Sequence, residues 1–123
     1  QRRLFVMRLS PSKYRPDIPY IAPYAVFNPE ILSVSDEKVS DWEGCFSVAR
    51  ASLFAKVIRP VKLHVRYLDE RAMVIERHLD GLEARIFQHE LDHLCGEVFL
   101  DRQPDPQTFM GVDEYRALLE ARA

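Results

Sequence analysis

Several features are scarce or missing in this sequence, and each absence excludes a class of protein. Only two cysteines occur in 123 residues, which is too few for a disulfide framework. No apolar run approaches the roughly 20 residues that a membrane-spanning helix needs. A formal net charge of −2 gives no reason to expect nucleic acid or an anionic membrane as a partner. No internal repeat or low-complexity tract is visible. What remains is an ordinary globular composition, 47% hydrophobic and 29% charged.

The length and the apolar pattern predict one α+β domain covering residues 1–123. A chain of this size can bury a core within a single domain. Val61–Leu68 alternates apolar and polar residues, as a half-buried strand does, and Met73–Leu79 would return beside it as a hairpin. Leu4–Met7 and Val26–Ser33 have the composition of further strands. We therefore expect antiparallel sheets packed around a central helix.

Two segments predict helices. Asp80 is the expected N-cap of the first, Glu83 is its capping-box acid three residues later, and Gly96 is a natural stop. A second, C-terminal helix is expected over Val112–Arg122. Irregular connections are expected at Ser10–Pro23, which carries four prolines, and at the polar segment Ser35–Asp41.

The first of these helices carries the pattern His-Glu-x-x-His at residues 89–93. On a helix His89 and His93 project from one face, where both imidazoles can share a metal ion. Glu90 lies beside the first of them, where a carboxylate can take a proton from an attacking water. Two buried, hydrogen-bonded histidines are the alternative interpretation. The glutamate between them favours a metal site.

A catalytic site of this kind needs three protein ligands and an open position. Upstream, Cys45 is a candidate because a thiolate and two imidazoles form a tetrahedral site with one vacancy. Downstream, Asp113 and Glu114 come at plausible distances and would make the protein a zinc peptidase. Cys45 could also be a small buried hydrophobic residue. The residues by themselves leave these alternatives open.

The residue pattern of the same predicted helix indicates an apolar wall beside the histidines. Leu82, Ile86, His89 and His93 lie at i, i+4, i+7 and i+11, which is one continuous stripe. The wall could line a pocket that leads to the metal, or Leu82 and Ile86 could simply belong to the hydrophobic core.

Two motifs in the chain resemble those of peptide deformylases. Glu43–Ser47 resembles the EGCxS motif of that family, and Gln88–Leu94 resembles its QHExDHL motif, in the same order. Asn28–Ile31 and Phe99–Asp101 match as well. The resemblance runs from Leu4 to about Asp101. It implies a metal-dependent hydrolase that removes the formyl group from the N-terminal formyl-methionine of new polypeptides.

The resemblance also implies a set of site residues. One divalent ion, Fe(II) with Zn(II) as a common substitute, would be held by Cys45, His89 and His93. Glu90 would shuttle the proton, and the backbone N–H of Phe46 would bind the oxyanion. The pocket for the methionine side chain would be lined by Phe46, Leu82 and Ile86. The expected partners are formyl-Met nascent peptides, with the ribosome as a further candidate, and neither nucleic acid nor a membrane.

One family motif is not found in this sequence. Peptide deformylases have a Gly-rich loop with a glutamine ahead of the first strand, and the chain starts directly before Leu4–Met7. We expect that loop to precede these residues in the complete protein. A catalytically inactive, deformylase-like binding module is a further alternative, which Phe46 also favours because leucine or glutamate is usual at that place.

The resemblance also bears on the compartment. The family implies the cytoplasm for a bacterial protein and a mitochondrion or plastid for a eukaryotic one. Cys45 must be reduced to bind a metal, which favours a reducing compartment.

Three further residues are expected to support the site. Arg59 and Glu43 could form a buried pair that fixes the Cys45 segment, although a solvated Arg59 is an equal alternative. Asp92 points away from the stripe of His89 and His93, so it is expected to be a supporting acid and not a ligand.

Overall fold

The computed structural model describes residues 3–13, 15–44, 53–96, 102 and 104–122. In chain order its elements are β1 (Leu4–Leu9), β2 (Ile21–Val34), β3 (Lys38–Gly44), β4 (Phe54–Pro60), β5 (Lys62–Leu68), β6 (Val74–Asp80), α1 (Gly81–Leu94), the short 3-10 helix η3 (Pro106–Thr108) and α2 (Val112–Arg122). Among the described residues, neither α1 nor α2 combines the length and the hydropathy that a membrane-spanning helix needs.

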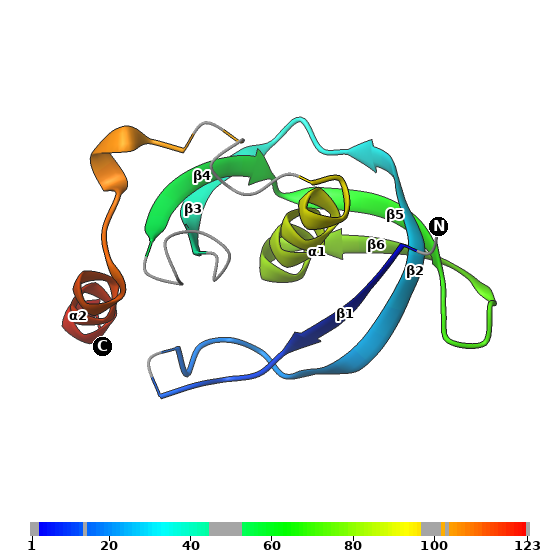
Figure 1. Ribbon diagram of the computed structural model, residues 1–123, viewed down its shortest axis with the longest axis horizontal. Helices are drawn as coiled ribbons and strands as arrows, with labels where there is room; N and C mark the ends of the chain where they lie inside the picture. The colour runs from blue at the N-terminus through cyan, green and yellow to red at the C-terminus, as the bar shows by residue number, and fades with distance from the viewer. Residues whose placement is uncertain (1–2, 14, 45–52, 97–101, 103, 123) are drawn as a thin grey trace.

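The larger sheet has the strand order β1-β2-β5-β6, and every neighbouring pair is antiparallel. Figure 1 shows α1 enclosed by the strands, with β1 and β2 curving around it. Residues alternate along each strand, so one side chain in two faces the helix. Phe87 of α1 is fully buried there, and its ring meets Phe5 of β1 edge-on at 5.1 Å. The core that results positions α1, and with it the His-Glu-x-x-His pattern.

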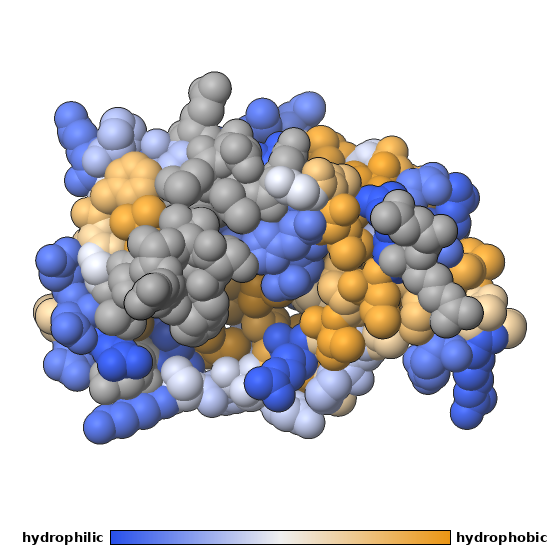
Figure 2. Space-filling model, viewed as in Figure 1, coloured by the Kyte–Doolittle hydropathy of each residue, from blue (hydrophilic) through white to orange (hydrophobic). Residues whose placement is uncertain are grey.

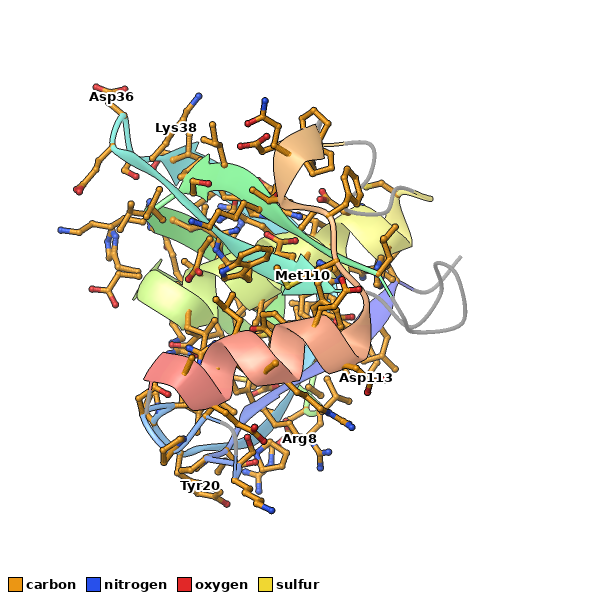
Figure 3. The ribbon with its side chains drawn as sticks, turned by 90° about the vertical axis from the view of Figure 1, so that its left-hand side faces the viewer. Arg8, Tyr20, Asp36, Lys38, Met110 and Asp113 are labelled. Atoms are coloured by element: carbon orange, nitrogen blue, oxygen red, sulfur yellow. The ribbon has the colours of Figure 1, made fainter. Side chains whose placement is uncertain are left out.

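A second, two-stranded sheet consists of β3 and β4, paired from Lys38–Pro60 to Gly44–Phe54. The segment after α1 returns alongside β4, where the backbones of Phe54 and Met110 exchange hydrogen bonds of 2.8 and 2.9 Å. Tyr115 of α2 then stacks on the Phe54 ring, with centroids 4.2 Å apart and planes 8° apart. Figures 1 and 3 show α2 lying outside the sheets. It packs on the small sheet through Tyr115, whose ring also meets the Trp42 ring of β3 at 5.8 Å.

The α+β class and the C-terminal helix are confirmed, whereas several strand boundaries were predicted wrongly. β2 begins at Ile21, inside the segment expected to be a loop, and β3 begins at Lys38, inside the segment expected to be a turn. β4 was not predicted at all. Much of β2 and β3 is exposed on both faces, so apolar alternation is weak there. Pairing with neighbouring strands, and not local pattern, decides these boundaries.

The start of α1 is also different from the prediction. Asp80 is the N-cap, but its side chain makes no capping hydrogen bond. Glu83 does not close a capping box either, because it accepts a 2.8 Å hydrogen bond from the Tyr24 hydroxyl and pairs with Arg77 at 3.3 Å. The Glu83 carboxylate thus binds the Tyr24 hydroxyl of β2 and the Arg77 guanidinium of β6. It therefore does not accept from the free backbone N–H groups at the start of the helix.

Candidate metal centre

His89, Glu90 and His93 of α1 form a compact group of potential metal ligands. One donor atom from each lies within 4.8 Å of the other two. The two imidazole rings are 4.5 Å apart at an angle of 67°, and His93 Nδ1 is 3.9 Å from Glu90 Oε2. All three side chains are partly accessible. The helical spacing therefore brings the two predicted ligands, His89 and His93, together with Glu90, the predicted proton shuttle, at a place that solvent can reach.

Glu43 of β3 holds the first histidine. Its Oε1 atom lies 2.9 Å from His89 Nδ1. Arg59 donates to Glu43 at 2.8 Å, and Arg85 donates at 2.6 Å. Burial alone raises the pKa of Glu43, but the hydrogen bonds and charges of Arg59 and His89 outweigh it and lower the pKa to about 2. Glu43 is thus a carboxylate at neutral pH.

This contact sets the tautomer of His89. A carboxylate is only an acceptor, so His89 Nδ1 carries the proton that it donates to Glu43. The Nε2 lone pair is then available. A metal-binding histidine is usually oriented in this way, by a hydrogen bond from its other ring nitrogen.

A second buried acid extends the network. Asp92 Oδ2 accepts a 2.9 Å hydrogen bond from Arg59 Nη1. Arg102 donates to both carboxylate oxygens of Asp92, through Nε to the same Oδ2 and through Nη2 to Oδ1. Burial raises the pKa of Asp92, but Arg102 and Arg59 outweigh it and lower the pKa. The predicted buried pair of Arg59 and Glu43 is confirmed, and Arg59 also bridges Glu43 to Asp92. Four buried charged side chains, those of Glu43, Arg59, Arg85 and Asp92, thus form one network behind His89.

A pocket of about 440 Å³ opens beside the histidines. Its lining is Leu9, Arg15, Ile18, Trp42, Glu43, Gly44, Leu82, Arg85, Ile86, His89, Glu90 and His93. Leu82 and Ile86 thus share one pocket with the ligand group, and Ile86 also packs against the main core. Figure 2 shows hydrophobic side chains gathered around a hollow at the centre of one face. The pocket has an apolar wall and a polar end.

The donors present fit a divalent transition metal. Two imidazoles are typical ligands of zinc and iron, and one of them is already oriented by a buried carboxylate. The neighbouring Glu90 carboxylate lies where it could take a proton from a water molecule at such an ion. Cys45 and Phe46 lie outside the described residues, so their roles stay predictions. Asp113 and Glu114 join no group of potential ligands in the described part of the chain. Glu114 instead accepts a hydrogen bond from the Gly111 backbone at 3.0 Å.

Several residues around the site were missed by the sequence analysis. Arg85 lies four residues before His89, so helical spacing could have placed it on the same face as the histidine. The sequence analysis looked for apolar residues on that face and therefore left this arginine out. Arg102 follows α1 with no fixed spacing. Arg15 and Ile18 come from the proline-rich connection between β1 and β2. No local pattern marks these last two as pocket residues.

Comparison by sequence matches this chain to deformylases. The family "Polypeptide deformylase" matches residues 1–108. "Peptide deformylase 2" of Nostoc sp. is 37% identical over 117 residues, which is 95% of this chain and 64% of that protein. The peptide deformylase of Treponema pallidum is 39% identical over 94 residues, 76% of this chain and 57% of that protein. The chain therefore spans less than two thirds of these relatives.

Solved structures agree with the sequence comparison. A class I type b peptide deformylase from Acinetobacter baumannii, with Met-Ala-Ser bound, has a TM-score of 0.75 and 36% identity, covering 81% of this chain and 62% of that one. The peptide deformylase of Thermotoga maritima has a TM-score of 0.61 and 41% identity over 66% of this chain and 54% of its own. With its family match over residues 1–108, this chain belongs to the polypeptide deformylase family.

Proposed function

We propose that the protein hydrolyses the formyl group from N-terminal formyl-methionine of newly made polypeptides. The observation that carries this proposal is the group His89, Glu90 and His93 at the polar end of an apolar pocket, in a chain of the deformylase family. The reaction needs a polarised carbonyl, an activated water and a place for the methionine side chain.

The proposed metal ion is Fe(II) or Zn(II), held by His89 and His93 with Cys45 as third ligand. When bound, such an ion polarises the formyl carbonyl and makes water more acidic. Glu43 would keep His89 in the tautomer that binds the ion. The buried charges of Arg59 and Arg85 in turn keep Glu43 ionised.

Glu90 is the proposed proton shuttle. Its carboxylate is partly exposed beside both histidines, so a water molecule can reach it. It would take a proton from the attacking water and pass it to the nitrogen of the departing methionine. Backbone donation from Phe46 to the oxyanion stays a prediction. Formate and a free N-terminus are the products.

The pocket supports methionine as the first residue of the substrate. Leu82 and Ile86 form its apolar wall, and Leu9 adds to it from β1. A long, unbranched side chain suits such a wall. The A. baumannii relative has Met-Ala-Ser bound, a peptide that begins with methionine. The ribosome as a partner and the cellular compartment stay predictions.

Two substitutions test this function with formyl-Met-Ala-Ser as substrate. Glu90→Gln should keep the metal content and lose turnover by about 10²–10⁴-fold, the usual contribution of general acid–base catalysis. His89→Ala should lose the metal itself. Metal analysis of each purified variant and release of formate are the measurements. Near-normal turnover of Glu90→Gln, or metal retained in full by His89→Ala, would exclude the mechanism.

A further inference from the structure

The connection between β1 and β2 is an ordered turn that reaches the pocket. The Ser12 N–H donates to the Arg15 carbonyl at 3.1 Å, and the Arg15 N–H donates back at 3.2 Å. The Arg15 N–H also contacts Ser12 Oγ at 3.1 Å, and the Ile18 N–H reaches the Arg15 carbonyl at 3.4 Å. These bonds fix the turn so that Arg15 and Ile18 line the pocket that contains His89 and Glu90.

Arg15 is held in place by its neighbours. Its Nε and Nη2 atoms donate to the two carboxylate oxygens of Asp17 at 3.1 and 3.2 Å. The hydrogen bond with Asp17 is the main reason that the pKa of Arg15 is raised, and Tyr115 of α2 adds to it. In Figure 3, α2 crosses above the segment that carries Tyr20, and Figure 1 places the same segment below α2. The guanidinium is therefore held by Asp17 of the turn and interacts with Tyr115 of α2.

The two arginines that line the pocket, Arg85 and Arg15, differ in how far their charges are neutralised by partners. Arg85 is 5% exposed, and its guanidinium donates to Glu43 and to two backbone carbonyls. Its charge is committed to the network behind His89. Arg15, with 30% of its side chain exposed, is the accessible cation among the described pocket residues, and its partner Asp17 is 68% exposed. Solvent weakens the hold of Asp17 on the guanidinium, because exposed ion pairs are screened.

We propose that Arg15 is a specificity residue that favours substrates with an acidic side chain in the two residues after the first methionine. This inference rests on the proposed function, which seats the formyl group at His89 and His93. With the methionine side chain against Leu82 and Ile86, the rest of the peptide leaves through the open side of the same pocket. Arg15 lies on that pocket's lining, so it can attract a carboxylate there without touching the reacting atoms.

The test compares peptides that differ only in charge. Met-Glu-Ser-amide is paired with Met-Gln-Ser-amide, and Met-Ser-Glu-amide with Met-Ser-Gln-amide, so that no terminal carboxylate contributes. Trp42 lines the pocket and is the single tryptophan of the chain, so its fluorescence reports binding to metal-loaded protein without any reaction. The formylated peptides are then assayed for KM and kcat. In at least one pair the acidic peptide should bind about two- to five-fold tighter, as expected for one exposed ion pair.

Three variants separate this role from a structural one. Arg15→Gln should abolish the preference for the acidic peptide, acting on KM and not on kcat. Asp17→Asn breaks the same ion pair but should enlarge the preference, because it frees the guanidinium. Arg71→Gln, an exposed arginine in the β5–β6 connection, is the matched control and should change nothing. High salt should remove the preference of the wild type.

The outcomes are distinguishable from failure of the proposed function. Equal binding of acidic and neutral peptides in both pairs, or a preference that survives Arg15→Gln, would overturn the role of Arg15. A protein that shows the charge preference in binding but releases no formate from any formyl peptide would overturn the proposed reaction and leave the role of Arg15 standing.

Discussion

At the scale of single residues, Glu43 connects the metal ligand to the buried charges. Its carboxylate accepts hydrogen bonds from His89, Arg59 and Arg85, and 7% of the residue is exposed. A buried charge is costly unless it is paired and fully hydrogen-bonded. Glu43 meets both conditions. The same contacts that stabilise it also orient His89, so stability and metal binding depend on one side chain.

Glu43→Gln should therefore damage both properties. The neutral amide leaves the charges of Arg59 and Arg85 without a full partner, and we expect a loss of about 3–5 kcal/mol in the free energy of unfolding. Metal affinity should fall by about 10–100-fold, as for other groups that orient a ligand. Urea unfolding and competitive metal titration measure the two effects.

The matched control is Glu30→Gln. Glu30 pairs with Arg66 at 2.8 Å, but both side chains are about half exposed. An exposed pair of this kind contributes about 0–1 kcal/mol. If the two variants lost similar stability, burial of Glu43 would not be the cause.

At the scale of elements, the Phe54 ring of β4 contacts both the end of β3 and α2. A Cβ atom added at Gly44 of β3 would lie 2.3 Å from the Phe54 ring of β4. That ring is also stacked on Tyr115 of α2. Gly44 is therefore needed for close approach, since any side chain there would push Phe54 away from Tyr115. The end of β3 and the position of α2 are coupled through this aromatic ring.

Gly44→Ala should cost about 1–3 kcal/mol of stability, the usual cost of overpacking. In a Phe54→Leu background the smaller side chain leaves more room, so the same substitution should cost less. A double-mutant cycle from urea unfolding measures the coupling. An equal loss in both backgrounds would mean that the strain at Gly44 does not come from Phe54.

At the scale of the whole molecule, α1 packs against the four-stranded sheet and carries the site on its remaining face. Its buried face presents Ala84 and Phe87 to the strands, whereas Leu82, Ile86 and the histidines line the pocket. The position of the ligand group thus depends on how well the other side of the helix packs. Interiors are close-packed, so a lost side chain is only partly compensated by relaxation.

Phe87→Ala should cost about 3–5 kcal/mol, as expected for a buried phenylalanine. The free energy of unfolding of a native protein is about 5–15 kcal/mol in total, so this substitution would remove much of the stability. Phe109→Ala removes the same side chain from a residue that is 38% exposed, so it should lower the free energy of unfolding by clearly less than Phe87→Ala does. Thermal and urea unfolding of both variants check this. Comparable losses would contradict a core centred on α1.

The sequence by itself determined what depends on neighbours along the chain. Helical periodicity placed Leu82, Ile86, His89 and His93 on one face, and alternation predicted most of β5 and the hairpin with β6. Two short motifs in order indicated the family. These signals are local, because the period of a helix or strand relates residues only a few positions apart.

Only the tertiary structure decided which distant residues meet. Glu83 bonds to Tyr24 and not to its own helix end, β2 and β3 extend through segments that read as loop and turn, and Arg15 reaches the pocket from a connection without any motif. Arg85 of α1 donates a hydrogen bond to Glu43 of β3, which is far from it in the sequence. Such partners carry no fixed spacing. They are chosen by packing, because a buried charge or an unpaired strand edge must be satisfied by whichever group the fold brings beside it.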